Sequence, residues 1–204
     1  MSIYVIADTH FGHDAIKLYE PVREGISDEM IIGLWNGIVS DEDEVWHLGD
    51  FAFKSRGWDY AKALKGKITL LKGNHDFKKS SAFLNEHGFV RVIDSIVLDI
   101  PLEEKQTIEQ RLHDSFSKEL LDSCVCWIQD IQGKRILFSH YPCFYEDVYA
   151  KPIENERKVI LESLFEWCHC DVNYHGHIHS KINEDTRCVN ASVEQTGFMP
   201  IKLC

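Results

Sequence analysis

Short apolar runs that end in polar residues recur along the first part of the chain. Ile3–Ala7 is followed directly by Asp8, the run 45–48 is followed by Gly49, and the run 67–71 is followed, after Lys72, by Gly73. Continuous apolar runs of this length are typical of buried strands in a parallel sheet. In open α/β sheets, ligands bind beyond the carboxyl ends of the strands. The pattern therefore predicts a functional site at one edge of a sheet.

Helical patterns lie between these predicted strands. Ser27 can cap a helix that runs to about Val39, with apolar residues at helical spacing along it. Shorter helical segments are expected over 14–19 and 58–64. The first part of the chain is therefore predicted to alternate strands with helices, which favours an α/β fold.

The second half of the chain combines a hairpin with helices. The segment 90–100 alternates enough for one or two strands, and Gly133 separates two strand patterns that indicate a hairpin over 125–138. Charged residues with helically spaced apolar positions predict a helical insertion at about 101–124. A helix is expected at 154–167, a strand at 171–174 and further strands over 187–193.

Composition and charge restrict the function classes. The 204 residues are 44% hydrophobic and 27% charged, as expected of one globular domain spanning 1–204. The net charge of −11 works against long nucleic acid as a partner, because such binding needs Lys and Arg to neutralise phosphates. We find no membrane-spanning stretch and no signal peptide, so we expect a cytoplasmic protein without a membrane partner.

Several polar residues outside the main motifs have ordinary structural explanations. The seven cysteines fit reduced thiols, and the C-x-C pairs 124/126 and 168/170 lack the spacing of common structural zinc sites. His47 is expected to be structural, whereas His13 and His175 stay open between supporting roles and substrate contacts. Arg23 is expected to form an exposed salt bridge, with binding of a substrate phosphate as the alternative.

Asp, His and Asn residues past the strand ends provide oxygen and nitrogen ligands, which suit Mn, Fe, Zn or Co. In Asp8-Thr9-His10 the side chains at i and i+2 would lie on the same side of an extended segment. His177 and His179 repeat that spacing. Two dications roughly 3.5–4 Å apart need a bridging carboxylate, and Asp50 suits this role because Gly49 allows close backbone approach. Such a centre stays positive and would attract a phosphate despite the acidic chain.

Together these motifs resemble the calcineurin-like metallophosphoesterase superfamily, and in particular its small, single-domain bacterial and phage members. The matching motifs are Asp8-Thr9-His10, Gly49-Asp50, Gly73-Asn74-His75-Asp76, His140 and Gly176-His177-Ile178-His179. They occur in the family's order and span positions 8–179. The resemblance implies a four-layer α/β/β/α sandwich of two mixed sheets flanked by helices.

The resemblance also implies the active-site chemistry. The expected ligands are Asp8, His10 and His179 for one ion and Asn74, His140 and His177 for the other, with Asp50 bridging. His75 corresponds to the catalytic histidine that binds no metal, and Asp76 or a backbone carbonyl would orient its ring. We expect two divalent ions, with Mn favoured over Fe, Zn, Co or Ni. A hydroxide bridging them would attack phosphorus while His75 protonates the leaving group.

The predicted function is therefore metal-dependent hydrolysis of a small phosphomonoester or phosphodiester, by a phosphatase or a phosphodiesterase. A small phosphodiester or cyclic nucleotide is favoured as substrate. A nuclease acting on short single-stranded nucleic acid is one alternative, and a basic groove leading to the metals would favour it. A non-catalytic interaction module with the same fold is the other, although every ligand position and His75 are present. The segment 101–124 would either cover the site or extend one edge of the fold. The sequence indicates no particular protein partner.

Overall fold

Two five-stranded mixed sheets form the centre of the computed structural model, which describes residues 1–147 and 150–203. The first sheet, in the order β10-β1-β2-β3-β4, contains β1 (Ile3–Ile6), β2 (Glu44–His47), β3 (Lys67–Leu71), β4 (Arg91–Ile93) and β10 (Ile201–Lys202). The second, in the order β5-β6-β7-β8-β9, contains β5 (Ile96–Asp99), β6 (Cys126–Ile131), β7 (Lys134–Ser139), β8 (Val172–His175) and β9 (Cys188–Asn190).

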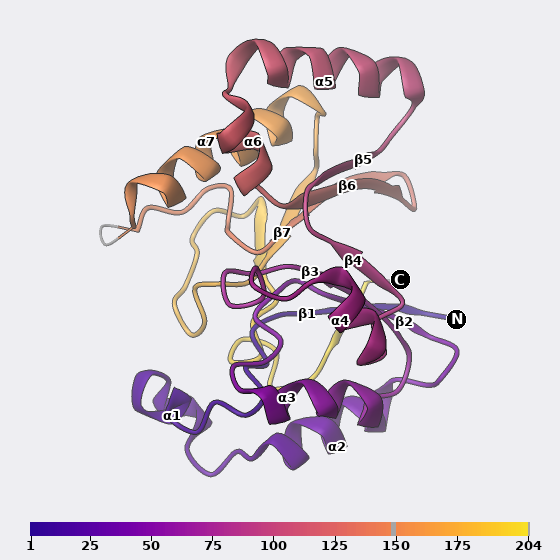
Figure 1. Ribbon diagram of the computed structural model, residues 1–204, viewed down its shortest axis with the longest axis vertical. Coiled ribbons are helices and arrows are strands. Elements are labelled where there is room, and N and C mark those ends of the chain that lie inside the picture. The colour runs from indigo at the N-terminus through magenta and orange to yellow at the C-terminus, as the bar shows by residue number, and fades with distance from the viewer. Residues whose placement is uncertain (148–149, 204) are drawn as a thin grey trace.

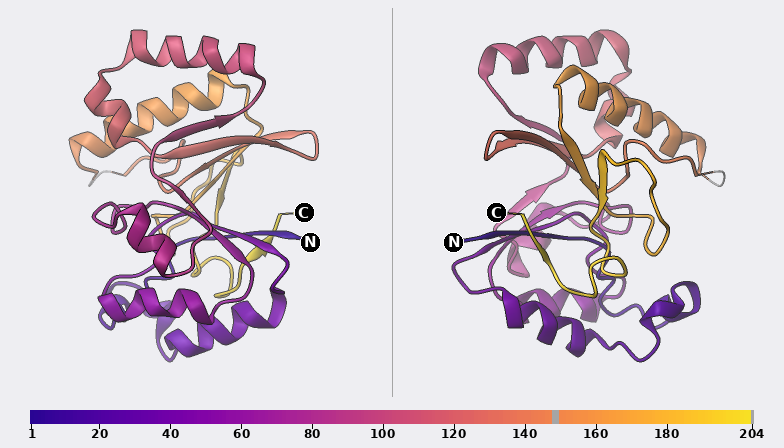
Figure 2. Two further views of the ribbon diagram at one scale, coloured as in Figure 1. Left: turned by 45° about the vertical axis from the view of Figure 1, so that its right-hand side comes forward. Right: turned by 180° about the vertical axis from the view of Figure 1, so that it is seen from behind.

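Helices cover the outer face of each sheet (Figures 1 and 2). On the first sheet's side lie α1 (Ile16–Tyr19), α2 (Asp28–Ile38), α3 (Ser55–Asp59) and α4 (Ser81–Glu86), with 3₁₀ turns at Pro21–Arg23 and Tyr60–Ala63. On the second sheet's side lie α5 (Leu102–Ser115), α6 (Lys118–Ser123) and α7 (Pro152–Trp167). This arrangement confirms the predicted four-layer sandwich.

Three apolar clusters hold the four layers together, one at each boundary between layers. Trp35 of α2, Trp58 of α3 and Leu70 of β3 belong to the cluster beneath the first sheet. Trp46 and Trp127 meet between the two sheets, with ring centroids 4.5 Å apart. The third cluster lies between the second sheet and α5 to α7. Alternate residues of a strand point to opposite faces, so β2 serves two clusters with Val45 and Trp46.

The register of the strands brings the loops of the first sheet to one edge. β1, β2 and β3 are mutually parallel, with Ile6 opposite His47 and His47 opposite Leu70. In the second sheet β7 and β8 are also parallel. The backbone of Ala7, at the end of β1, forms hydrogen bonds with Ala191 and Val193, which follow β9. This junction joins the loop edges of the two sheets.

The helix predicted after Ser27 is confirmed, and the Ser27 hydroxyl accepts a hydrogen bond from the Met30 N–H. Ile31 and Trp35 are the buried residues of this helix. Met30 and Ile38, which share the apolar spacing, are 48% and 40% exposed. The buried face of α2 is therefore narrower than the apolar pattern in the sequence indicates.

The segment 90–100 forms two strands that belong to different sheets, because the chain crosses from the first sheet to the second between β4 and β5. The predicted helical insertion contains α5 and α6. Their buried residues Ile108, Leu112 and Leu121 belong to the apolar cluster between the second sheet and its helices. In Figure 1, α5 lies at the opposite end of the molecule from α2 and α3. Within the described residues, no helix is long and apolar enough to span a membrane.

Candidate active site

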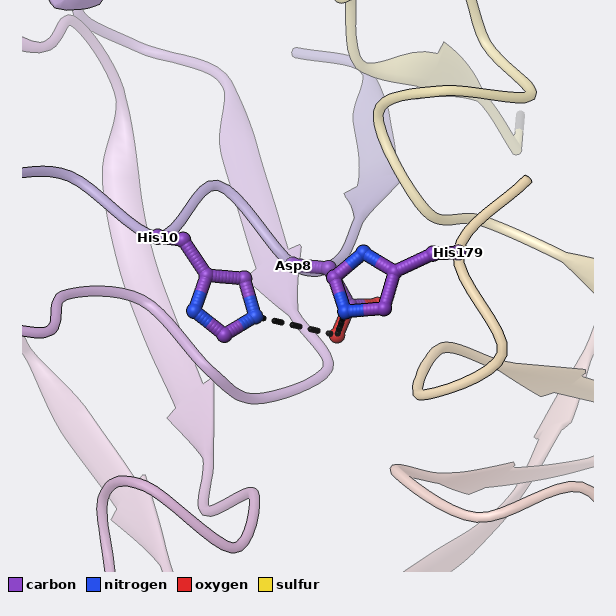
Figure 3. A group of neighbouring side chains, drawn as sticks. All are labelled: Asp8, His10 and His179. Carbon is purple, nitrogen blue, oxygen red and sulfur yellow. Dashed lines mark ion pairs between the residues drawn. The ribbon is translucent and has the colours of Figure 1, made fainter. Parts of the chain in front are cut away.

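The polar residues that follow the strands meet at the shared loop edge of the two sheets. The His10 Nε2 atom lies 3.8 Å from Oδ1 of Asp8 and 3.5 Å from Oδ2 of Asp50. From the second sheet's side, His179 brings its Nε2 atom to 3.9 Å from the same Asp8 oxygen. Figure 3 shows the imidazoles of His10 and His179 converging on the Asp8 carboxylate.

Asp50 also faces a second set of side chains. The His140 Nε2 atom lies 3.4 Å from Oδ2 of Asp50 and 3.0 Å from Oδ1 of Asn74. The ring of His177 lies 5.1 Å from that of His140, measured between centroids. The Asp50 carboxylate thus stands between the group containing His10 and the group containing His140.

The donor atoms fit divalent metal ions. Among the described residues, three groups have ligand atoms close enough to hold an ion, namely Asp8, His10 and His179; His10, Asp50 and His75; and Asp8, Asp50 and His140. Asp8 Oδ1 and both ring nitrogens of His10 are buried, yet they have no hydrogen-bond partner. A buried polar atom without a partner is costly, so a cation at this position would satisfy Asp8 Oδ1 and the Nε2 atom of His10 that faces it.

Five of the converging residues have left-handed backbone conformations. Their φ angles are 58° at Asp8, 49° at His10, 57° at Asp50, 71° at His177 and 50° at His179. Each such residue costs of order 1–3 kcal/mol, and such strain clusters at functional sites. The extended geometry predicted for Asp8-Thr9-His10 is therefore wrong. The two side chains do converge, but through tight turns that follow the strand.

Close packing around the carboxylates requires glycine at three positions. A Cβ on Gly49 would lie 2.5 Å from the Gly73 nitrogen and 2.8 Å from Nδ1 of His140. A Cβ on Gly73 would overlap Oδ1 of Asp50, and one on Gly176 would overlap Oδ2 of Asp8. The close approach predicted for Gly49 is confirmed.

Asp76 organises the loops that carry Asp50 and Asn74. Its buried carboxylate accepts hydrogen bonds from the backbone N–H groups of Gly73, Asp50 and Phe51, at 2.9, 2.7 and 3.3 Å. The expected contact with the His75 ring is not among its hydrogen bonds in the described chain. The geometry therefore gives Asp76 a supporting position beneath the site, and the orienting contact with His75 does not form.

Arg23 occupies a different environment from the one predicted. Its side chain is only 3% exposed, and its Nε and Nη2 atoms lie 2.6 and 2.5 Å from Oε1 of Glu194. The guanidinium also donates to the carbonyl oxygens of Asp8 and Thr9. The predicted exposed salt bridge is therefore wrong, because the pair is buried beneath the Asp8 loop.

Glu194 is the residue that sequence reasoning missed. Its Oε1 atom lies 2.9 Å from Nδ1 of His179, and its side chain is fully buried. This contact leaves Nε2 of His179 facing Asp8. The sequence signal was weak, since Glu194 only follows a short apolar strand pattern and matches no motif named above.

The comparisons with known proteins agree with this geometry. The sequence signature of the calcineurin-like phosphoesterase superfamily domain matches residues 1–195. The chain belongs to this superfamily. It is thus a metallophosphoesterase by family. The family implies divalent metal ions, and the Asp and His groups just described could hold them.

Individual relatives of this calcineurin-like chain differ in how far they match. A solved structure, a protein of unknown function from Aquifex aeolicus, is 26% identical with a TM-score of 0.69, covering 98% of this chain and 95% of that one. An uncharacterized protein from Methanocaldococcus jannaschii is 36% identical over 81 residues, which are 36% of this chain and 46% of that protein. An archaeal phosphodiesterase is 17% identical with a TM-score of 0.46, covering 93% and 82%.

Burial and mutual charge set the protonation of the converging side chains. Burial lowers the pKa of His10 well below 6.5 and that of His177 to about 3, so both rings are neutral and able to ligate. Burial alone would raise the pKa of Asp50, but the neighbouring histidines outweigh it and lower that pKa. Burial opposes protonation of His140 as well, yet the charge of Asp50 raises its pKa to about 9. Without a cation, His140 therefore holds a proton.

His75 is the most accessible of the histidines that surround Asp50. Its backbone N–H donates to Oδ1 of Asp50 at 2.9 Å, and its side chain is 39% exposed. The ring Nε2 atom lies 3.8 Å from Oδ2 of Asp50. The ring therefore borders the Asp50 carboxylate, and part of it is open to solvent.

The structure also shows the environments of the histidines and cysteines that lie outside the matched motifs. His47 is structural, because its Nε2 atom lies 3.0 Å from the Thr9 hydroxyl and its Nδ1 accepts from Gly49 N–H. His175 is buried and contacts the Gly176 carbonyl and Asn183. The six described cysteines are free, and within the described ranges none joins a metal-ligating group. His13 is partly buried beside the site, with its ring centroid 5.7 Å from that of His10.

Proposed function

We propose that this chain hydrolyses small phosphodiesters with the help of two divalent metal ions. The observation that carries the proposal is the convergence of unpartnered buried donors on the shared carboxylate of Asp50. Metal-dependent phosphoester hydrolysis is the chemistry of the family to which the chain belongs. The net charge of −11 favours a small substrate over long nucleic acid, because few cations remain to neutralise a phosphate backbone.

In this proposal seven side chains hold the ions. They are Asp8, His10 and His179 for one ion, Asn74, His140 and His177 for the other, and Asp50 for both. When bound, the ions would activate a water molecule and stabilise negative charge on the phosphoryl oxygens. Manganese suits this set of carboxylate, amide and imidazole ligands.

His75 donates a proton to the leaving oxygen in the same proposal. Its backbone is anchored on Asp50, and its partly exposed ring lies beside the ligand groups. A group in this position can reach a substrate oxygen without binding a metal. General acid catalysis of this kind contributes about 10²–10⁴-fold to the rate.

Arg23 and Glu194 keep the first ligand group in place. Glu194 accepts a hydrogen bond from the Nδ1–H group of His179, which fixes the tautomer with Nε2 free for a metal. Arg23 compensates the Glu194 charge and ties down the backbone carbonyls of Asp8 and Thr9. These contacts therefore hold the strained backbone turn at Asp8 in place.

A comparison of two leaving groups tests the role of His75. His75→Ala should retain both metal ions and lose about 10²–10⁴-fold in kcat on an alkyl phosphodiester. It should lose far less on a nitrophenyl ester, whose leaving group departs without protonation. His87→Ala is a matched control, because His87 pairs with Asp59 away from the site. Equal losses on both esters would count against the general-acid role, and no turnover by the wild-type protein would overturn the proposed function.

A further inference from the structure

Beside His75, two aromatic rings form a stacked pair at the surface. The rings of Phe53 and His13 are 4.0 Å apart between centroids and inclined by only 13°. The Phe53 ring lies 5.3 Å from that of His75 in an edge-to-face arrangement. Phe53 is 46% exposed. Because His13 covers one face of the Phe53 ring, the exposed area belongs to its other face and its edges.

The backbone holds this pair in a fixed position. The Phe11 N–H donates to the Phe51 carbonyl at 2.9 Å, and the Phe53 N–H donates to the Phe11 carbonyl at 3.0 Å. The His13 N–H donates to the His10 carbonyl at 3.0 Å. The loops that carry the rings are thus hydrogen-bonded to each other and to the ligand segment. A preorganised aromatic surface loses little conformational entropy when it binds another ring.

Phe53 is not needed for the core of the first sheet. Phe51 on the same loop and Phe11 on the facing loop are both completely buried, and their centroids lie 5.1 Å apart. Phe53 belongs to none of the three apolar clusters described above. The loop therefore buries one phenylalanine and presents the next one to solvent beside the proposed proton donor.

We propose that the exposed surface of Phe53, backed by His13, binds a planar aromatic ring in the leaving group of the substrate. This inference rests on the proposed function, in which His75 protonates the leaving oxygen. Because the Phe53 ring lies 5.3 Å from that of His75, a ring attached one or two bonds beyond that oxygen would lie next to Phe53, and adjacent aromatic rings attract. Nucleobases and phenyl groups share this chemistry, so the substrate class is phosphoesters of aromatic or nucleoside alcohols.

Two non-hydrolysable ligands separate stacking from simple hydrophobic contact. Benzylphosphonate and cyclohexylmethylphosphonate carry the same phosphonate and bury similar apolar areas, but only the first has a planar π-system. Their dissociation constants can be measured by titration calorimetry with the Mn²⁺-loaded protein, so the result does not depend on turnover. The wild-type protein should bind benzylphosphonate roughly two-fold to twelve-fold more tightly, the range expected for one aromatic pair.

Substitutions at Phe53 locate the effect. Phe53→Leu should abolish the preference for the aromatic ligand, whereas Phe53→Trp should keep or increase it. Phe77→Leu is a matched control, since Phe77 is 37% exposed and packs near Arg157 instead of His13. It should leave the preference unchanged.

The possible results are distinguishable. Equal affinity of the wild-type protein for both phosphonates would overturn the aromatic subsite while leaving the proposed function intact. An equal loss of affinity for both ligands in Phe53→Leu would also overturn the subsite alone. If neither phosphonate nor inorganic phosphate binds to the metal-loaded protein, the proposed function fails, and the subsite fails with it.

Discussion

Replacing Glu194 by glutamine tests how the first ligand group is held. The substitution keeps the size of the side chain but removes the charge that faces Arg23 and His179. Glutamine can also donate a hydrogen bond, so it no longer fixes His179 with Nδ1 protonated. Loss of such a supporting partner typically lowers metal affinity by about 10–100-fold. We expect this loss for the ion bound by Asp8, His10 and His179 and a much smaller change for the other.

The same substitution should destabilise the metal-free protein. Removing one partner of a buried ion pair costs about 3–5 kcal/mol, and Arg23 is only 3% exposed. Arg23 retains its hydrogen bonds to the carbonyls of Asp8 and Thr9, which favours the lower end, about 3 kcal/mol. For a chain of this length, that corresponds to a decrease in Tm of about 6–12 °C.

Calorimetry separates these two effects. Titration with Mn²⁺ gives the affinity of each ion, and differential scanning calorimetry gives Tm. Glu104→Gln is the matched control, because Glu104 pairs with the partly exposed Arg135 far from the site. It should cost less than about 1 kcal/mol and leave metal binding unchanged. Wild-type affinity for both ions in Glu194→Gln would refute the positioning role.

A double variant provides a further check. Adding Arg23→Met to Glu194→Gln removes both members of the buried pair, so no unpaired charge remains. Part of the lost stability should return, since replacing both partners of a buried pair is often neutral. Metal affinity should stay low, because His179 still lacks its carboxylate partner. If stability and metal affinity recover together, Glu194 acts only through the stability of the fold.

Three further predictions concern the rest of the site. Asp50→Ala should lower the occupancy of both ions in metal analysis, and loss of only one would contradict a shared carboxylate. Because the pKa of His140 is about 9, metal binding must displace its proton, so Mn²⁺ affinity should rise roughly tenfold per pH unit from about 6.5 to 9; a flat profile would contradict this. Gly49→Ala should cost at least about 2 kcal/mol in chemical denaturation, because its φ of 101° and close neighbours exclude a Cβ. Gly37→Ala, inside α2 and with open space around Gly37, should cost no stability and should add up to about 1 kcal/mol, because Ala favours a helix over Gly.

Much of the fold could be predicted because local patterns and strand ends coincide in this chain. The strand over Lys67–Leu71 and the helix after Ser27 follow directly from apolar spacing and capping chemistry. The pairing of strands is not local information. The segment 90–100 therefore predicted one or two strands, but not that β4 and β5 join different sheets.

The sequence predicted which residues form the site, but it predicted their geometry only in part. The motifs named the side chains that converge around Asp50. The left-handed turns at Asp8 and His10 could not be predicted from residue type, because even Asp and His adopt positive φ in only a minority of cases. The Arg23–Glu194 contact joins positions 171 residues apart. Neither residue lies in one of the matched motifs, so only the folded chain reveals that Arg23 is buried beneath the Asp8 loop.

Turnover measured against bound metal tests the central claim most directly. Protein dialysed against a chelator should not hydrolyse bis-nitrophenyl phosphate, and activity should rise with added Mn²⁺ to a plateau at two bound equivalents. A rate that survives complete removal of metal would contradict the account. So would an absence of hydrolysis when two ions are bound.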